Sequence, residues 1–172
     1  EPTATSDTQP WPKPNNTARI SITTEEHVWC SRPEISLFNF FENPSNLNLI
    51  TPSWLNFTLL PPVPCTTFEN QEIEYKLTLH NIRFKWTSRI IDYQKNISFC
   101  DKQIKGPYAF WEHQHRFEKI GSETLVTDIV KYKILPGVLS PILGSFTNML
   151  FVERDLRKIF GYRQEKIREL FS

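Results

Sequence analysis

Hydrophobic and polar residues alternate through much of the middle of the chain. Within residues 69–134, the alternation covers 73–79, 84–90, 97–103, 111–117 and 126–134. A period of two places successive side chains on opposite faces of an extended chain, so each segment predicts a β-strand with one apolar face. The join at 80–82 is short enough for a hairpin. We therefore predict a run of consecutive antiparallel strands over this region.

The N-terminal part has a different character. Residues 1–17 hold four of the 13 prolines and show no periodic apolar pattern, which predicts a flexible Pro-rich arm. Proline and polar residues divide the next stretch into short elements. We predict a strand, two short helices and a second strand, at 20–30, 34–41, 45–50 and 55–59.

Apolar residues recur at helical spacing in the C-terminal part of the chain. They are Leu139, Ile142, Leu143, Phe146, Met149, Leu150, Leu156, Ile159, Phe160, Ile167 and Leu170. We predict a long amphipathic helix whose apolar stripe packs into the concavity of the sheet. We interpret Arg154 and Arg163 as part of its solvated charged face, with contact to an anionic ligand at a cavity mouth as the alternative. Residues 18–172 would then form one domain.

Composition narrows the class of protein. The chain has 172 residues and a net charge of +1, from 20 basic and 19 acidic residues, so an electrostatic nucleic-acid binder is not indicated. It has no apolar run of membrane-spanning length. Cys30, Cys65 and Cys100 are widely spaced and match no metal pattern, which favours a reducing compartment. We expect a cytoplasmic protein, with a signal segment removed before Glu1 as the alternative; the pattern does not indicate an oligomeric state.

Residues 111–117 carry the densest candidate chemistry. A strand there would place Trp111, His113, His115 and Phe117 on one face. If this face lines a cavity, it is a binding wall with two polar groups; if it faces a packed core, each histidine needs a partner there. An imidazole can donate and accept a hydrogen bond and titrates near neutrality, so either histidine could also act as an acid or base.

Three further polar residues fall on predicted inward faces. Asp101 and Gln103 share a strand face with apolar residues, and Asp128 does the same on the last strand. The carboxylates could orient the histidines and fix their tautomers, or they could point to water at a β-bulge. A His-x-His pair offers two metal ligands, but no third is signalled nearby, so we predict no metal and no cofactor. Cys100 alternates with Phe99 and should point away from a cavity.

The order of elements resembles the START-like (SRPBCC) superfamily, which has the helix-grip fold. The segments that carry the resemblance are Arg32-Pro33-Glu34, Asn43-Pro44, Ile50-Thr51-Pro52, 82–86, 101–108, 111–117, Thr127-Asp128, Arg154-Asp155-Leu156 and 160–163. Together they are most similar to a bacterial, polyketide-cyclase-like subgroup of ligand-binding proteins. The resemblance implies an α+β fold in which a curved antiparallel sheet wraps around the long helix, with a hydrophobic cavity between them.

We therefore expect a protein that binds a small hydrophobic or amphipathic ligand, such as a lipid, polyketide or isoprenoid-like molecule, for sequestration or transport. Two alternatives stay open: a cyclase or dehydratase with His113 or His115 as general base, and an interaction module with a collapsed cavity. The expected ligand-binding residues are Tyr75, Trp86, Phe99, Asp101, Gln103, Trp111, His113, His115, Phe117 and Asp128.

Overall fold

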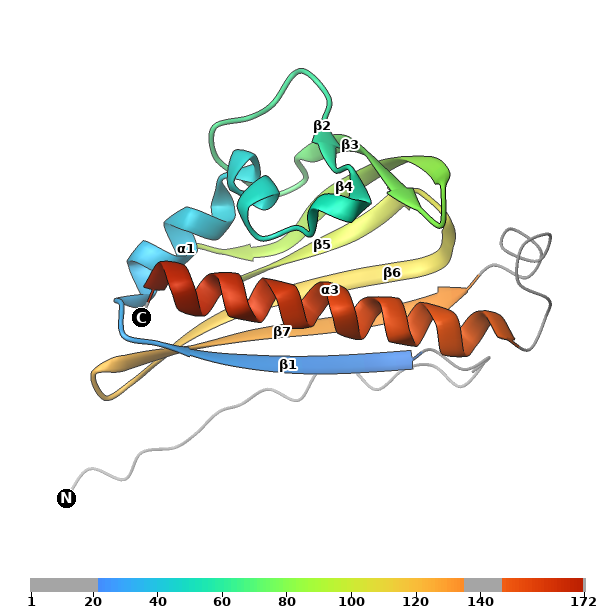
Figure 1. Ribbon diagram of the computed structural model, residues 1–172. Coiled ribbons are helices and arrows are strands. Elements are labelled where there is room, and N and C mark those ends of the chain that lie inside the picture. Colours follow the sequence, from blue (N-terminus) through green and yellow to red (C-terminus); the bar gives the residue numbers. More distant parts are fainter. Residues whose placement is uncertain (1–21, 135–146, 172) are drawn as a thin grey trace, which may run out of the picture.

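The computed structural model describes residues 22–134 and 147–171, which form one antiparallel sheet, a long helix and a group of short helices (Figure 1). The sheet has seven strands in the order β1-β7-β6-β5-β4-β3-β2. The strands are β1 (Ile22–Cys30), β2 (Thr58–Leu59), β3 (Glu72–Leu79), β4 (Ile82–Gln94), β5 (Ser98–Lys105), β6 (Tyr108–Ile120) and β7 (Glu123–Ile134). The helices are α1 (Glu34–Glu42), α3 (Thr147–Phe171) and the 3₁₀ helices η1 (Pro44–Leu49) and η2 (Ser53–Leu55).

Helix α3 runs across the inner face of the sheet, and the short helices lie at one side of it (Figure 1). Its inward stripe is buried, through Val152, Leu156, Phe160 and Ile167. At its C-terminal end, Ser31 N donates a hydrogen bond of 3.2 Å to the carbonyl oxygen of Phe171. The predicted arm at 1–17 and the first part of the predicted helix, 139–146, lie outside the described residues. No helix in the described part is both long and apolar enough to cross a membrane.

The short elements after β1 differ in detail from the prediction. Helix α1 forms as expected and buries Leu37, Phe38 and Phe41 against the sheet. The second predicted helix is the 3₁₀ helix η1, which begins where Asn43 Oδ1 accepts a hydrogen bond of 3.0 Å from Ser45 N. The strand predicted at 55–59 begins late. Asn56 has a left-handed backbone conformation (φ 45°) that ends η2, so extended pairing starts only at Thr58.

Strand register brings the candidate residues together. Asp101 of β5 pairs with His113 of β6, and His115 of β6 pairs with Asp128 of β7. Cross-strand partners point to the same face of a sheet, so these four side chains share one face. That face is the inner one, because His113, His115 and Phe117 are buried while Arg116 is exposed. The predicted period-two pattern of β6 is confirmed.

Candidate functional site

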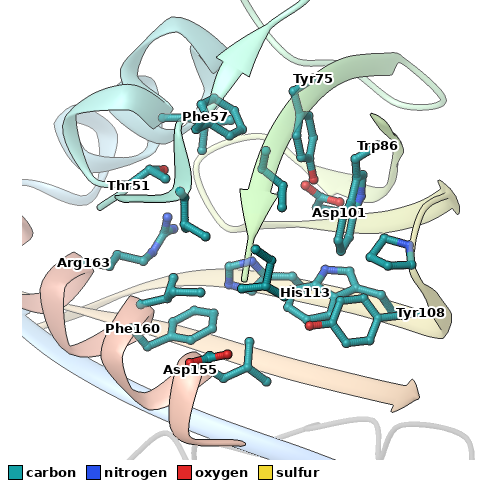
Figure 2. A pocket seen from close by; sticks show the side chains of 18 of the residues that line it. Thr51, Phe57, Tyr75, Trp86, Asp101, Tyr108, His113, Asp155, Phe160 and Arg163 are labelled. Atoms are coloured by element: carbon teal, nitrogen blue, oxygen red, sulfur yellow. The ribbon is translucent and has the colours of Figure 1, made fainter. Parts of the chain in front are cut away.

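A cavity of about 150 Å³ lies between helix α3, the short helices and the inner face of the sheet (Figure 2). Its walls are mainly apolar and come from three layers of the fold. The helix supplies Val152, Leu156, Ile159 and Phe160; the short elements supply Leu47, Ile50, Leu55 and Phe57; the sheet supplies Leu77, Leu79 and a group of aromatic residues.

The aromatic residues of the sheet form one continuous wall. Trp86 stacks on Tyr75, with ring centroids 5.8 Å apart and planes 17° apart, and it meets Trp111 edge-on at 5.4 Å. Tyr108 lies 4.9 Å from Trp111, and Phe57 lies 5.0 Å from Tyr75. Rings packed this way hold one another in place, so the wall is preorganised rather than assembled by a ligand.

Asp101 is the polar residue within this wall. Figure 2 shows its carboxyl group between Tyr75 and Trp86. Its Oδ1 atom is buried and has no hydrogen-bond partner among the residues that the structure describes. Burial raises the pKa of Asp101; the Ser88 hydroxyl, His113 and Arg163 act in the opposite direction. A buried acceptor without a donor destabilises the folded protein. The unpaired oxygen of Asp101 is therefore not explained by a contribution to stability.

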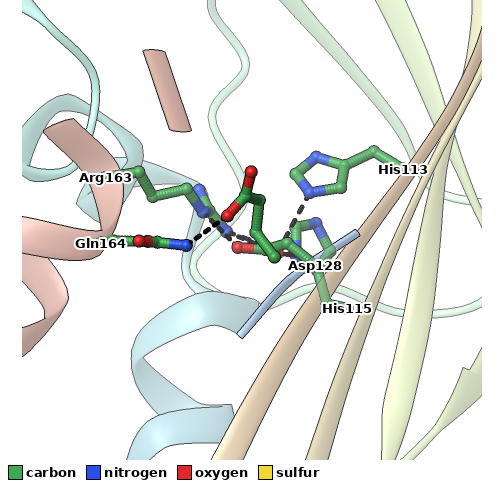
Figure 3. Close-up of polar contacts among 6 residues, drawn as sticks. His113, His115, Asp128, Arg163 and Gln164 are labelled. Carbon is green, nitrogen blue, oxygen red and sulfur yellow. Dashed lines mark hydrogen bonds and ion pairs between the residues drawn. The ribbon is translucent and has the colours of Figure 1, made fainter. Parts of the chain in front are cut away.

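Behind Asp101, Asp128 is the centre of a buried polar cluster (Figure 3). Its Oδ1 atom lies 3.0 Å from His113 Nε2 and 2.7 Å from His115 Nδ1. Arg163 donates from Nε to Oδ2 over 2.8 Å and from Nη2 to Oδ1 over 3.3 Å. Arg163 is only 6% exposed, and its guanidinium lies 4.8 Å from the ring centroid of Phe41. The carboxylate therefore has a donor from each of three side chains.

The cluster fixes the protonation of the histidines. A carboxylate accepts only, so His113 carries a proton on Nε2 and His115 carries one on Nδ1. Arg163 Nη2 also lies 3.3 Å from His115 Nδ1, but that nitrogen already donates to Asp128. Burial, together with the charges of His113 and Arg163, lowers the pKa of His115 to about 3. Burial of Asp128 acts to raise its pKa, but Arg163 and the two imidazole donors hold that pKa well below its ordinary value.

The two histidines do not face the same space. His113 lines the main cavity, where it meets Phe160 at a ring distance of 5.2 Å. His115 lines a second hollow of about 30 Å³ next to helix α1, where Phe41 packs 5.9 Å from it. Asp101 and Arg163 border both spaces. A ligand in the main cavity can therefore contact His113 and Asp101, while His115 remains behind them.

A hydrogen bond between a histidine and a carboxylate lies at the edge of the cavity. His80, in the turn between β3 and β4, places Nε2 2.6 Å from Oδ2 of Asp155 on α3. Leu79 and Asp155 line the cavity. The pair thus fastens the hairpin to the helix on one side of the bound space.

No family model and no curated protein sequence matches the chain. Among solved structures, protein CV1439 from Chromobacterium violaceum matches with a TM-score of 0.64 and 8% identity, over 87% of this chain and 96% of that one. The di-domain aromatase/cyclase StfQ of the steffimycin biosynthetic pathway matches with a TM-score of 0.63 and 15% identity, over 86% of this chain and 48% of StfQ. The Zhui aromatase/cyclase from Streptomyces matches with a TM-score of 0.59 and 15% identity, over 87% of this chain and 97% of Zhui.

The chain has the helix-grip fold of the START-like (SRPBCC) superfamily. The predicted α+β architecture is thereby confirmed. The helix-grip cavity expected from the resemblance is present, in contrast to the collapsed interior of the interaction-module alternative.

The expected ligand-binding residues fall into three groups around the helix-grip cavity. Tyr75, Trp86, Asp101, Trp111 and His113 line it. Phe99 and His115 line the second hollow. Phe117 and Asp128 lie in the packed interior behind these residues, with Phe117 5.0 Å from the ring of Phe41.

Gln103 has a structural role in a turn instead of a position in the wall. Its amide donates to the carbonyl oxygen of Tyr108 over 2.8 Å and accepts from Tyr108 N over 3.3 Å, which braces the turn between β5 and β6. Cys100 points to the outer face of the sheet, as predicted, beside Glu112 and Gln114. Burial raises the pKa of the Cys100 thiol, which opposes any nucleophilic role.

Arg163 is the residue that the sequence interpretation misplaced. The charge pattern predicts that it belongs to a solvated face, whereas it is buried on Asp128; Arg154 is exposed as expected. The spacing held the information, because Leu156, Phe160, Arg163 and Ile167 follow one helical stripe at intervals of four, three and four residues.

The cluster has part of the geometry of a metal site. Donor atoms of His113, His115 and Asp128 lie within 4.8 Å of one another. The Arg163 guanidinium, however, is bound to both oxygens of the same carboxylate. A metal cation there would have to displace a permanent positive charge from its partner, so the chemistry of the donor set disfavours it.

Proposed function

We propose that the chain binds a compact, largely apolar molecule with one polar group inside the helix-grip cavity, for sequestration or transport. The observation that carries the proposal is an apolar cavity with one buried acceptor, Asp101 Oδ1, that has no donor among the described residues. Ligand sites commonly combine apolar walls with a few placed polar groups. A ligand donor at Asp101 would remove the cost of the unpaired oxygen.

The volume of the cavity narrows the ligand class. Apolar cavities of about this size hold a benzene-sized molecule. The expected lipid, polyketide or isoprenoid-like ligand therefore narrows to roughly one ring with a short side chain. Burying on the order of 150 Å² of such a ligand would contribute about 4 kcal/mol, offset by the cost of immobilising it. Burial alone therefore gives a dissociation constant no tighter than about 1 mM, and tighter binding requires a further contribution such as a hydrogen bond to Asp101.

Titration with indole tests this proposal. Indole should shift the NMR signals of the Trp86 and Trp111 side chains saturably, because both rings line the cavity. The variant Leu77→Trp would fill the space and should weaken indole binding by at least about tenfold. Ile91→Trp is the matched control, since Ile91 pairs with Cys100 on the outer face of the sheet. No saturable change in the wild type, or an equal loss in both variants, would contradict the proposal.

A cyclase or dehydratase activity is the second candidate, and one observation favours it. His113 lines the cavity and is oriented by a carboxylate through Nε2, so its Nδ1 could accept a proton. StfQ and Zhui are described as aromatase/cyclases. His115 lies outside the main cavity, so the general-base role is proposed for His113 alone. For an enzyme, His113→Ala should abolish turnover and keep ligand affinity; for a carrier, it should change affinity alone.

A further inference from the structure

The polar groups around Asp101 also form hydrogen bonds with other partners. The groups that face it are Tyr75 from β3, Ser88 from β4, His113 from β6 and Arg163 from α3. Arg163 and His113 donate to Asp128. Ser88, whose hydroxyl interacts with the Asp101 carboxyl group, itself accepts from Trp86 Nε1 over 3.1 Å. These contacts leave Oδ1 without a partner among the described residues, and a donor on a molecule in the cavity would supply one.

The rings beside Asp101 favour a positive donor. Tyr75, Trp86 and Trp111 present a continuous aromatic wall at the same place as the carboxyl group. The faces of aromatic rings carry negative charge, and tryptophan attracts cations most strongly. An anionic head group would meet both this wall and the carboxylate, which repel it.

The charges around the cavity also favour a cationic ligand. Among the described residues that line it, Arg163 is the permanent cation, and its charge is matched by Asp128. Asp155, at the edge, is hydrogen-bonded to His80. Arg163 and His113, which favour the ionised form of Asp101, donate their hydrogen bonds to Asp128 instead. A ligand cation would pair with Asp101 and would favour the ionised carboxylate against the effect of burial.

We propose that the ligand is a primary amine in its protonated form, carried on a single aromatic ring or a body of similar size, with its ammonium group bound to Asp101. The inference rests on the proposed function, since it names the chemistry of the molecule that the same cavity binds. One ammonium proton bonds Asp101 Oδ1, and the ring of the ligand lies among Phe57, Leu77 and Phe160. The charge-assisted hydrogen bond and the aromatic wall together select amines over alcohols of the same shape.

Calorimetry with three matched probes tests the inference at neutral pH. The probes are 2-phenylethylamine, 2-phenylethanol and phenylacetate, which place an ammonium, a hydroxyl and a carboxylate on similar bodies. The proteins are the wild type, Asp101→Asn, and Asp92→Asn as control. Asp92 is exposed and has a left-handed backbone conformation (φ 54°) that asparagine adopts readily, so this control makes the same chemical change away from the cavity.

We expect the wild type to bind the amine at least about tenfold more tightly than the alcohol, with phenylacetate weakest. Asp101→Asn should weaken the affinity for the amine by at least about tenfold and change the affinity for the alcohol by less than about threefold. Asp92→Asn should have the affinities of the wild type. The comparison of amine and alcohol affinity in the wild type needs no variant. It therefore tests the amine inference even if Asp101→Asn is poorly folded.

The possible failures separate the two proposals. Equal affinity for amine and alcohol in the wild type, or unchanged amine affinity in folded Asp101→Asn, would overturn the amine inference and leave cavity binding standing. If none of the three probes and no indole binds, cavity binding and the amine inference both fail.

Discussion

The buried ion pair between Arg163 and Asp128 allows a quantitative test of the cluster. The two side chains are 7% and 4% exposed, and Arg163 Nε lies 2.8 Å from Asp128 Oδ2. Replacing Arg163 with Met keeps much of the side-chain volume but leaves Asp128 buried without a cation. Removing one partner of a buried pair typically costs about 3–5 kcal/mol. We expect about 3 kcal/mol for Arg163→Met, because the two imidazoles still donate to the carboxylate.

A second arginine on the same helix provides the control. Arg157 pairs with Glu153, but its side chain is 68% exposed. Exposed pairs contribute about 0–1 kcal/mol, so Arg157→Met should change the free energy of unfolding by less than about 1 kcal/mol. Urea denaturation, followed by circular dichroism, gives both values.

The double variant isolates the electrostatic part of the effect. Asp128→Asn removes the uncompensated charge, so Arg163→Met should cost less in that background than in the wild type, with a coupling energy of about 2 kcal/mol. The reasoning is refuted if Arg163→Met costs no more than Arg157→Met, or if the two changes at the cluster are additive. Either result would mean that Asp128 is solvated or protonated in the folded protein.

Three further outcomes are expected. The pKa of His115 is about 3 when folded against an ordinary 6.5, so between these pH values the unfolded chain binds a proton that the folded chain does not. The free energy of unfolding should therefore fall with falling pH by about 1.4 kcal/mol per pH unit, with Asp128 adding to the loss below about pH 4; His115→Gln should flatten the slope in urea titrations from pH 6.5 to 4.5. Gly106→Ala should cost about 1–2 kcal/mol in thermal unfolding, because a Cβ there would lie 2.4 Å from Gln103 Oε1, and little in a Gln103→Ala background. His80→Ala should change stability by under about 1 kcal/mol but speed the dissociation of indole in NMR line-shape analysis; an unchanged rate would separate the hairpin from ligand exchange.

The sequence was sufficient for the strands because one face of each is buried. The alternation over 73–79 and 111–117 reflects that burial. The resemblance to the helix-grip fold predicted that the helix lies in the concavity of the sheet. The short elements after α1 were harder to predict, because their form depends on single residues such as Asn56, whose left-handed backbone the pattern does not encode.

The site could be predicted only as a set of inward residues. His113 and His115 are two positions apart on one face, but His115 is packed between Phe41 and Phe99 and does not line the main cavity. The other charged residues around Arg163 predict a solvent-exposed position, although its spacing matches the buried stripe. A charged residue on an apolar stripe is buried only when it has a partner of opposite charge. The partner of Arg163 is Asp128, which lies 35 positions earlier in the chain, so the local pattern does not reveal it.

Asp101 also acts as a partition between two chambers. The main cavity and the smaller hollow beside α1 share its side chain as a common border, together with Leu47, Ile50 and Arg163. Arg163 is held by Asp128, so rotation of Asp101 is the simpler way to open one chamber to the other. Shortening this residue, as in Asp101→Ala, would join them and let longer molecules enter. Asp101 thus contributes both to the limit on ligand length and to head-group preference, so size selectivity and head-group preference would change together at this position.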